Sequence, residues 1–255
     1  MYKISANTLF IGQDYIYLPV CHSTNSEAFE YLGKNRVSDG MVLNTSNQTA
    51  GRGQRGNIWR SAPDQNLTFS VVLKPAFLRA QEQFRLNMAV SMALADLLAD
   101  FSRAIKIKWP NDIYADNKKL AGILIEIFLK NAAIESAITG IGLNVNQTDF
   151  GLPGITSLSA LTGRSYELQP LLETLCEKLE NRYLQLRQGN YEKIKQDYLQ
   201  QLYWYQEEHL FEDLRQGDRK KFAGTILGID TTGKLAVQTS SKIEHFSFKE
   251  IRFVQ

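Results

Sequence analysis

The chain has 255 residues, of which 44% are hydrophobic and 22% charged, values typical of a globular protein that exclude a disordered or collagen-like chain. At about 150 residues per domain, this length predicts one large domain or a large and a small one. The formal net charge of +2 argues against a protein whose overall charge attracts nucleic acid. The two cysteines and three histidines are scattered, so neither a disulfide framework nor a structural zinc site is expected.

The sequence contains no segment that we expect to enter a membrane. Residues 1–12 lack a basic segment followed by an apolar stretch, which a secretory signal requires. No apolar run approaches the roughly 18 residues needed to cross a bilayer. We therefore expect a cytoplasmic protein without a membrane partner.

Residues 1–205 are predicted to form an α+β body. Ser23, Thr24 or Asn25 could cap a short helix over 27–34. Apolar residues at helical spacing predict a helix over 84–101, and alternating Ile and Lys predict a strand over 105–109 that ends before Pro110. The other expected elements are strands at 41–43, 66–74, 120–129 and 133–145, a helix at 156–161, and two helices within 169–202 that are separated at Gly189 and Asn190.

Beyond Trp204 the composition changes to short strands, which indicates a second, smaller unit. The expected strands are 209–213, 221–230, 234–239 and 244–253. Short strands joined by tight turns are typical of a small β-barrel. We therefore predict two domains, residues 1–205 and 206–255.

The polar segment 44–65 contains G-R-G-Q-R-G at positions 51–56. A dinucleotide-binding G-x-G-x-x-G continues into a helix, whereas this segment leads to the predicted strand 66–74, which excludes that fold. Arg52 and Arg55 add permanent charges to a loop rich in exposed backbone N–H groups, so the loop suits a bound anion. A solvated turn or an RNA contact would use the same residues. Trp59 offers a flat face for a base, or an anchor for the loop.

Two further clusters follow the ends of predicted strands. The sequence K-W-P-N-D at 108–112 places Asp112 where it can pair with Lys118 or Lys119 across a hairpin, either as a plain ion pair or as part of a site. Gly122 leaves room there for a ligand or another backbone segment. The sequence G-I-G-L-N-V-N at 140–146 adds glycines and amides, which fit either a ligand site or a simple turn.

Taken in order, G-R-G-Q-R-G-N-I-W, K-W-P-N-D-I-Y with K-K-L-A-G-I-L-I-E, and G-I-G-L-N-V-N resemble biotin–protein ligases (biotin–acetyl-CoA-carboxylase ligases) over nearly the whole chain from Ser23. The resemblance implies an α+β fold, with a mixed β-sheet backed by helices, related to class II aminoacyl-tRNA synthetases, and a C-terminal SH3-like barrel. It also implies a two-step reaction. Biotin and ATP give biotinyl-5′-AMP and pyrophosphate, and a lysine of a biotin carboxyl carrier protein then receives biotin as an amide.

The resemblance also assigns site residues. It implies biotin contacts at Ser23, Thr24, Asn25, Gln48, Arg52, Gly53, Gln54, Lys119 and Gly122, and ATP or adenylate contacts at Trp59, Asn111 and Asn144. We expect Arg52, Lys108 and Lys119 to gather the anionic substrates and stabilise the α-phosphate. Asp112 is expected to accept a proton from the carrier lysine or to position its amine. Magnesium is expected on the phosphates, without a dedicated protein site.

The chain departs from the family pattern at two places. Gln54 stands where a second arginine is common, and Arg55 could replace the missing charge or the adenylate could be held less firmly. About 20 residues precede Ser23, too few for a winged helix-turn-helix. We therefore expect a ligase without DNA-binding repressor function.

Other activities fit parts of the sequence. A lipoate or octanoate ligase of the same fold, a non-catalytic biotin or nucleotide sensor, and an RNA-binding module are the alternatives. An exposed strand edge could serve either a homodimer or docking of the carrier protein.

Overall fold

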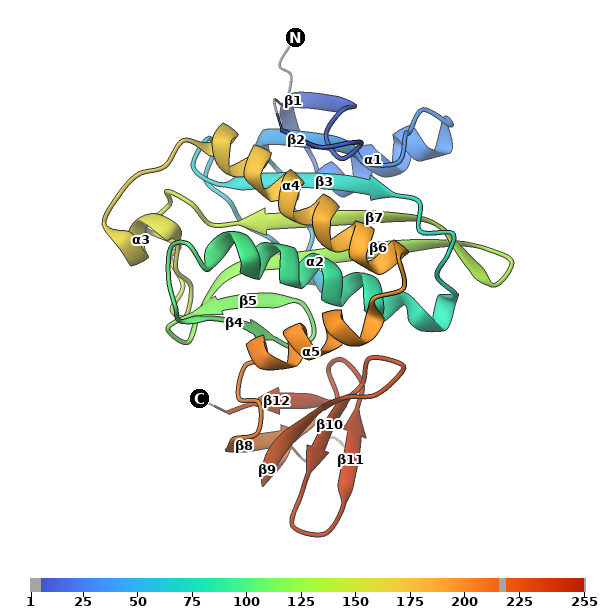
Figure 1. The fold of residues 1–255 in the computed structure, drawn as a ribbon. Helices are drawn as coiled ribbons and strands as arrows, with labels where there is room; N and C mark the ends of the chain where they lie inside the picture. Colours follow the sequence, from blue (N-terminus) through green and yellow to red (C-terminus); the bar gives the residue numbers. More distant parts are fainter. Residues whose placement is uncertain (1–5, 216–218, 255) are drawn as a thin grey trace.

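The computed structural model describes residues 6–215 and 219–254, which form two β-sheets and the helices packed against them (Figure 1). The elements in chain order are β1 (Tyr15–Cys21), α1 (Thr24–Gly33), β2 (Met41–Gln48), β3 (Leu67–Leu73), α2 (Gln83–Leu98), β4 (Ile105–Lys108), β5 (Asp112–Ala115), β6 (Lys118–Lys130), β7 (Ala133–Leu143), α3 (Leu158–Thr162), α4 (Leu168–Arg187), α5 (Tyr191–Gln201), β8 (Glu208–Asp213), β9 (Lys220–Ile229), β10 (Leu235–Gln238), β11 (Ile243–Phe246) and β12 (Ile251–Phe253), with short 3-10 helices at Gln54–Gly56 and Ala80–Glu82. The expected mixed sheet backed by helices is confirmed.

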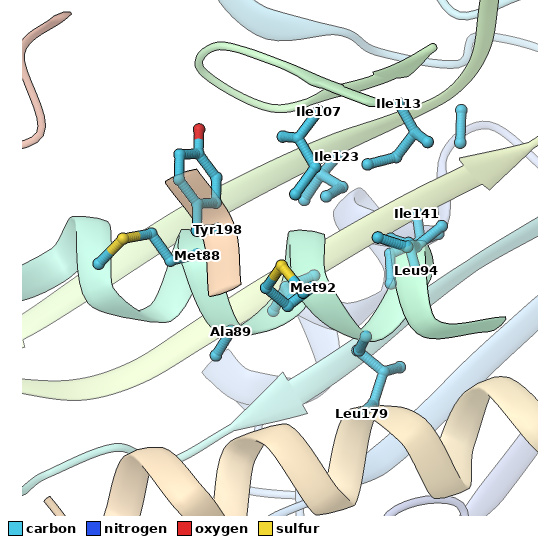
Figure 2. Close-up of a cluster of buried hydrophobic side chains, with 14 of the residues drawn as sticks. Met88, Ala89, Met92, Leu94, Ile107, Ile113, Ile123, Ile141, Leu179 and Tyr198 are labelled. Carbon is cyan, nitrogen blue, oxygen red and sulfur yellow. The ribbon is translucent and has the colours of Figure 1, made fainter. Parts of the chain in front are cut away.

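The larger sheet has seven strands in the order β1-β2-β3-β7-β6-β5-β4. Strand β1 runs parallel to β2, and the other neighbours are antiparallel. Helices α2, α4 and α5 cover one face (Figure 1). Figure 2 shows α2 within this core, with side chains from four neighbouring strands around it: Ile107, Ile113, Ile123 and Ile141.

The opposite face carries the residues of interest. Because side chains alternate along a strand, the neighbours of these isoleucines lie on this face, among them Lys108, Asp112, Gly122 and Gly142. Helix α1 covers part of it, where Ala28 belongs to a small second cluster of buried side chains from β2, β3 and β7. The part formed by β4, β5 and the adjoining half of β6 is left for a site.

A β-bulge brings Lys119 to the same face. The register between β5 and β6 pairs Ile113 with Ala121 and Tyr114 with Lys119, so Leu120 is an extra residue. Leu120 and Ala121 are both fully buried. An extra residue shifts the alternation by one position, so that Lys119 lies on the face of Gly122 instead of in the core.

Most predicted elements are confirmed to within a few residues, including the break between α4 and α5 at Gly189 and Asn190. Strands β1 and β5 are additions to the prediction. Strand β2 continues through residues 44–48, predicted as loop, because it pairs with β1 on one side and β3 on the other. Asp112 begins strand β5 instead of ending a strand, and the strand predicted over 244–253 is divided into β11 and β12.

The smaller sheet has five antiparallel strands in the order β11-β10-β9-β8-β12. It packs against the end of β4, where Trp109 Nε1 donates to the carbonyl of Gly233 at 2.9 Å and the indole meets the ring of Phe248. One continuous core joins the two sheets. The boundary between residues 205 and 206 stays a prediction. None of the described helices combines the length and apolar composition that spanning a membrane requires.

Candidate active site

A cavity of about 540 Å³ lies on the open part of the larger sheet, a volume within the range of small-molecule sites. Segment 48–59 and the smaller sheet form its other walls. It is lined by the predicted residues Ser23, Thr24, Asn25, Gln48, Arg52, Gly53, Gln54, Trp59, Lys108, Asn111, Asp112, Lys119 and Gly122. The structure thus brings together residues that are spread over a hundred positions of sequence.

Asn144 is the predicted site residue that does not line this cavity. Its side chain is 2% exposed and donates from Nδ2 to the carbonyl of Thr156 at 3.0 Å. It therefore organises the chain beyond β7. Asn111 does line the cavity, but its amide donates to the carbonyl of Ile123 and so joins β5 to β6.

One end of the cavity is a network of buried polar groups. The backbone N–H of Thr24 donates to Gln48 Oε1 at 2.8 Å, and Ser70 Oγ lies 2.7 Å from Thr24 Oγ1 and 2.6 Å from Asn25 Oδ1. A methyl group at Gly140 would overlap the Asn25 amide, so the glycine is required by this close approach. Buried hydrogen-bonded networks hold their members in fixed positions, which suits recognition of a polar ligand.

Segment 51–59 is a short hairpin. Arg52 and Ile58 form an antiparallel bridge, and hydrogen bonds join Gly53 N to Asn57 O at 2.7 Å and Trp59 N to Gly51 O at 3.0 Å. Arg52 donates from both terminal nitrogens to the carboxylate of Glu126, at 3.1 and 2.7 Å. Its charge is therefore paired with a residue that sequence reasoning missed.

Arg55, expected as a substitute for the charge missing at Gln54, has a side chain outside the described residues. Glu126 could have been found, because it stands four positions after Gly122 on one strand and so shares its face. The same alternation of side chains along a strand could also have placed Ser70 and Tyr114 on this face of the sheet. The smaller sheet contributes Lys249, Arg252 and Phe253 to the cavity wall, which no local pattern indicated.

Trp59 packs on a pair of glycines. Gly122 and Gly142 stand opposite each other on β6 and β7. A methyl group at Gly142 would overlap the indole ring, and one at Gly122 would lie 3.3 Å from Trp59 Cζ3. The indole Nε1 is buried against Gly142 and has no acceptor among the described residues. Trp59 thus presents an aromatic surface beside the cavity.

Three charged side chains meet at the other end. Lys119 Nζ lies 2.7 Å from Asp112 Oδ1, so Lys119, not Lys118, is the partner of Asp112 across the hairpin. Lys108 is the cross-strand neighbour of Asp112 on β4. Two cations therefore flank one carboxylate, and an anionic ligand would find net positive charge here.

Aromatic rings surround the Lys108 amine. Its Nζ lies 4.6 Å from the centroid of Tyr114, 5.1 Å from Phe253 and 5.8 Å from Tyr203. Burial lowers the pKa of Lys108, and the charge of Lys119 lowers it further, while Asp112 opposes both effects.

The Tyr114 hydroxyl accepts a hydrogen bond from Lys108 at 3.4 Å. Burial, reinforced by the charge of Asp112, raises the pKa of Tyr114 to about 12. The phenol therefore stays protonated at neutral pH and keeps a proton to donate to a bound anion.

Residues 17–144 match the model of the biotin/lipoate A/B protein ligase family. The bifunctional ligase/repressor BirA of Bacillus spizizenii is 30% identical over 253 residues, which cover 95% of this chain and 74% of that protein. The biotin–acetyl-CoA-carboxylase ligase of Mycobacterium tuberculosis is 32% identical over 173 residues, 66% of this chain and 63% of that protein.

The fold is also shared with solved structures. The biotin protein ligase from Aquifex aeolicus, solved in complex with biotin and ATP, superposes with a TM-score of 0.79 at 24% identity. The match covers 95% of this chain and all of that one. The likeness therefore includes the smaller sheet as well as the larger one.

Proposed function

The chain belongs to the biotin/lipoate A/B protein ligase family, and we propose that it is a biotin–protein ligase that uses ATP. It activates biotin as biotinyl-5′-AMP and transfers it to a lysine of a biotin carboxyl carrier protein. The observation that carries the proposal is one cavity with three parts: a buried polar network, an aromatic surface at Trp59, and the pair of Lys119 and Asp112.

In the first step, a biotin carboxylate attacks the α-phosphate of ATP, and both groups are negative. The polar network around Thr24 and Gln48 suits the ring of biotin, while Trp59 offers its face to adenine. Lys119 and Lys108 bring the two anions together and stabilise the charge that develops on the α-phosphate. Because Arg52 is paired with Glu126, we assign it mainly to holding the loop on the ligand.

In the second step, the amine of the carrier lysine must be neutral to attack the adenylate. With a free pKa of about 10.4, reaching that state at pH 7 costs about 4.6 kcal/mol. In this proposal Lys119 exchanges its contact with Asp112 for one with the phosphate of the adenylate. Asp112 then accepts the proton of the incoming amine, as the amine forms the amide bond with the biotinyl carbonyl carbon, the bond from that carbon to the phosphate oxygen breaks, and AMP leaves.

Magnesium supplies charge neutralisation for the triphosphate and its pyrophosphate leaving group. Asp112 is the one carboxylate among the described residues that line the cavity, and the described part of the chain holds no group of three metal-ligating side chains. This donor set fits an ion carried on the phosphates that keeps most of its water ligands.

The partners and the remaining architecture are part of the proposal. The biotin carboxyl carrier protein of acetyl-CoA carboxylase or a related enzyme is the acceptor, and it reaches the enzyme in the cytoplasm. A homodimer would use an exposed strand edge, such as β1 at the end of the larger sheet. We propose no DNA partner, and we assign the smaller sheet to an SH3-like barrel and the larger one to the class II synthetase type.

Exchange of pyrophosphate into ATP tests the first step. Exchange that depends on biotin and is not supported by lipoate is the expected result. Exchange that depends on lipoate or octanoate would favour the alternative ligase, and no exchange with any acyl acid would favour a sensor or an RNA-binding module.

We expect Gly142→Ala to weaken adenylate binding about 10-fold to 100-fold, the range set by one base stacked on an aromatic ring. The added methyl group overlaps the Trp59 indole and forces it from its position. Calorimetry with a non-hydrolysable adenylate analogue measures the change. Gly33→Ala, where a methyl group meets no atom within 4 Å, is the matched control. Equal affinities in both variants would rule out the assigned role of Trp59.

We expect Gln54→Arg to slow the release of biotinyl-AMP, because it adds a permanent charge to the cavity wall beside an anionic ligand. The loss of labelled adenylate from the wild type and the variant, followed by filtration, gives the two rates. A change of about tenfold corresponds to one favourable hydrogen bond to a charged group. An unchanged rate would indicate that Gln54 already holds the adenylate fully.

The lowered pKa of Lys108 predicts a pH dependence. A lysine with a lowered pKa loses its charge at a lower pH than an exposed lysine, so kcat/KM for ATP in the exchange reaction should fall as the pH rises through that value. Lys108→Arg, which keeps its charge, should move this alkaline limit upward, whereas Lys106→Arg on the same strand should not. An alkaline limit that is identical in all three proteins would exclude Lys108 as its origin.

A further inference from the structure

Glu126 is a carboxylate beside the cavity that the proposed reaction does not use. It lies on β6, on the same face as Gly122, and accepts three hydrogen bonds from two other segments. Arg52 of the hairpin 51–59 donates two of them, and Asn25 Nδ2 in the first turn of α1 donates the third at 2.8 Å. A single carboxylate therefore connects the hairpin, helix α1 and the sheet.

The geometry points to Glu126 as a positioning residue that fixes the hairpin 51–59 and the Asn25 amide for ligand binding. The two terminal nitrogens of Arg52 donate to the two carboxylate oxygens of Glu126. Such a bidentate pair fixes the orientation of the guanidinium group as well as its distance from the carboxylate. The Arg52 and Glu126 side chains are 44% and 32% exposed, and an ordinary ion pair at that exposure contributes little to overall stability. The effect of this pair is therefore local.

The Asn25 side of the contact reaches the polar end of the cavity. Asn25 is 3% exposed, and its Oδ1 lies 2.6 Å from Ser70 Oγ. Since Glu126 accepts from the Asn25 NH2 group, the Asn25 oxygen is directed to Ser70. Glu126 thus orients one member of the buried polar network and anchors the hairpin that carries Trp59.

Glu126→Gln is the direct test. An amide replaces one acceptor oxygen with an NH2 group, which would face the N–H donors of Arg52 or Asn25. We expect hydrogen exchange of the backbone in residues 51–59 to become about tenfold faster in the ligand-free protein, as for one lost hydrogen bond to a charged group. This measurement does not depend on catalysis. Unchanged exchange would contradict the positioning role of Glu126 without affecting the proposed function, and a failure of the proposed function would leave the exchange result valid.

The kinetic readout rests on the proposed function. A hairpin that is fixed in place contributes equally to the binding of the substrate and of the transition state. In Glu126→Gln, KM for biotin should therefore rise about tenfold, while kcat changes less than about twofold. Glu135→Gln removes a carboxylate of β7 that pairs with Lys130 at 3.3 Å, and it should change neither quantity. Arg52→Lys, which keeps the charge but removes the fork, should reproduce the faster exchange.

The outcomes are distinct. Unchanged exchange over residues 51–59 in both Glu126→Gln and Arg52→Lys would overturn the inference, as would equal effects in Glu135→Gln. Faster exchange that extends to the buried strand β3 would mean general unfolding and would also count against it. Exchange confined to 51–59, with a higher KM for biotin and an unchanged kcat, is the predicted result.

Discussion

Lys119→Met should lower the rate of biotin-dependent pyrophosphate exchange about 10²–10³-fold, the effect of removing one preorganised group that stabilises transition-state charge. Lys119 is the cation whose Nζ lies against Asp112 and beside Gly122 under Trp59, where we propose that the carboxylate and the α-phosphate meet. Methionine keeps an unbranched stem of similar length and removes the ammonium group, with its charge and its N–H donors. Initial rates at saturating biotin and ATP measure the loss.

Lys118→Met is the matched control, because Lys118 is the exposed neighbour of Lys119 on the same strand. It should retain full activity. If Lys119→Met kept more than half of the wild-type rate, the site of activation would have to lie elsewhere in the cavity.

Asp112→Asn should slow the transfer of biotin from preformed biotinyl-AMP to the carrier about 10²–10⁴-fold, the usual contribution of a general base. The amide is nearly the same size as the carboxylate but cannot accept the proton of the attacking lysine. Rapid-quench measurements with purified adenylate bypass the first step, so the result reports transfer alone.

Asp116→Asn provides the control in the same hairpin. Asp116 has a φ of +47°, a conformation that asparagine tolerates, so this variant should transfer biotin at the wild-type rate. An Asp112→Asn protein that transfers equally fast would show that Asp112 only holds Lys119.

The sequence predicts an element correctly where one residue type or one hydrophobic period dominates the segment. The helical spacing of apolar residues is enough to predict α2, and the glycine and asparagine between α4 and α5 are enough to predict the break between these helices. Strand β1 was missed because it lies at the sheet edge, where half-buried positions leave no clear alternation. The polar end of β2 became a strand only because β1 and β3 pair with it, and such pairing is not visible in one segment.

The candidate site also contains some residues that the sequence could indicate and others that depend on contacts between distant segments. Motif residues such as Trp59, Asp112 and Lys119 could be selected from their spacing and from the family resemblance. The bulge at Leu120, which brings Lys119 to the site face, depends on how β5 and β6 register and has no signature in the sequence. Phe253 reaches the Lys108 amine from the smaller sheet, about 145 positions later in the chain, through tertiary packing alone.

Modification of a carrier protein tests the central claim most directly. A biotin carboxyl carrier domain incubated with this protein, ATP and either biotin or lipoate should gain biotin on a single lysine, as measured by intact mass and peptide mapping. The modification should require ATP and should be absent with lipoate. A carrier that stays unmodified, or one that receives lipoate in preference to biotin, would contradict the account.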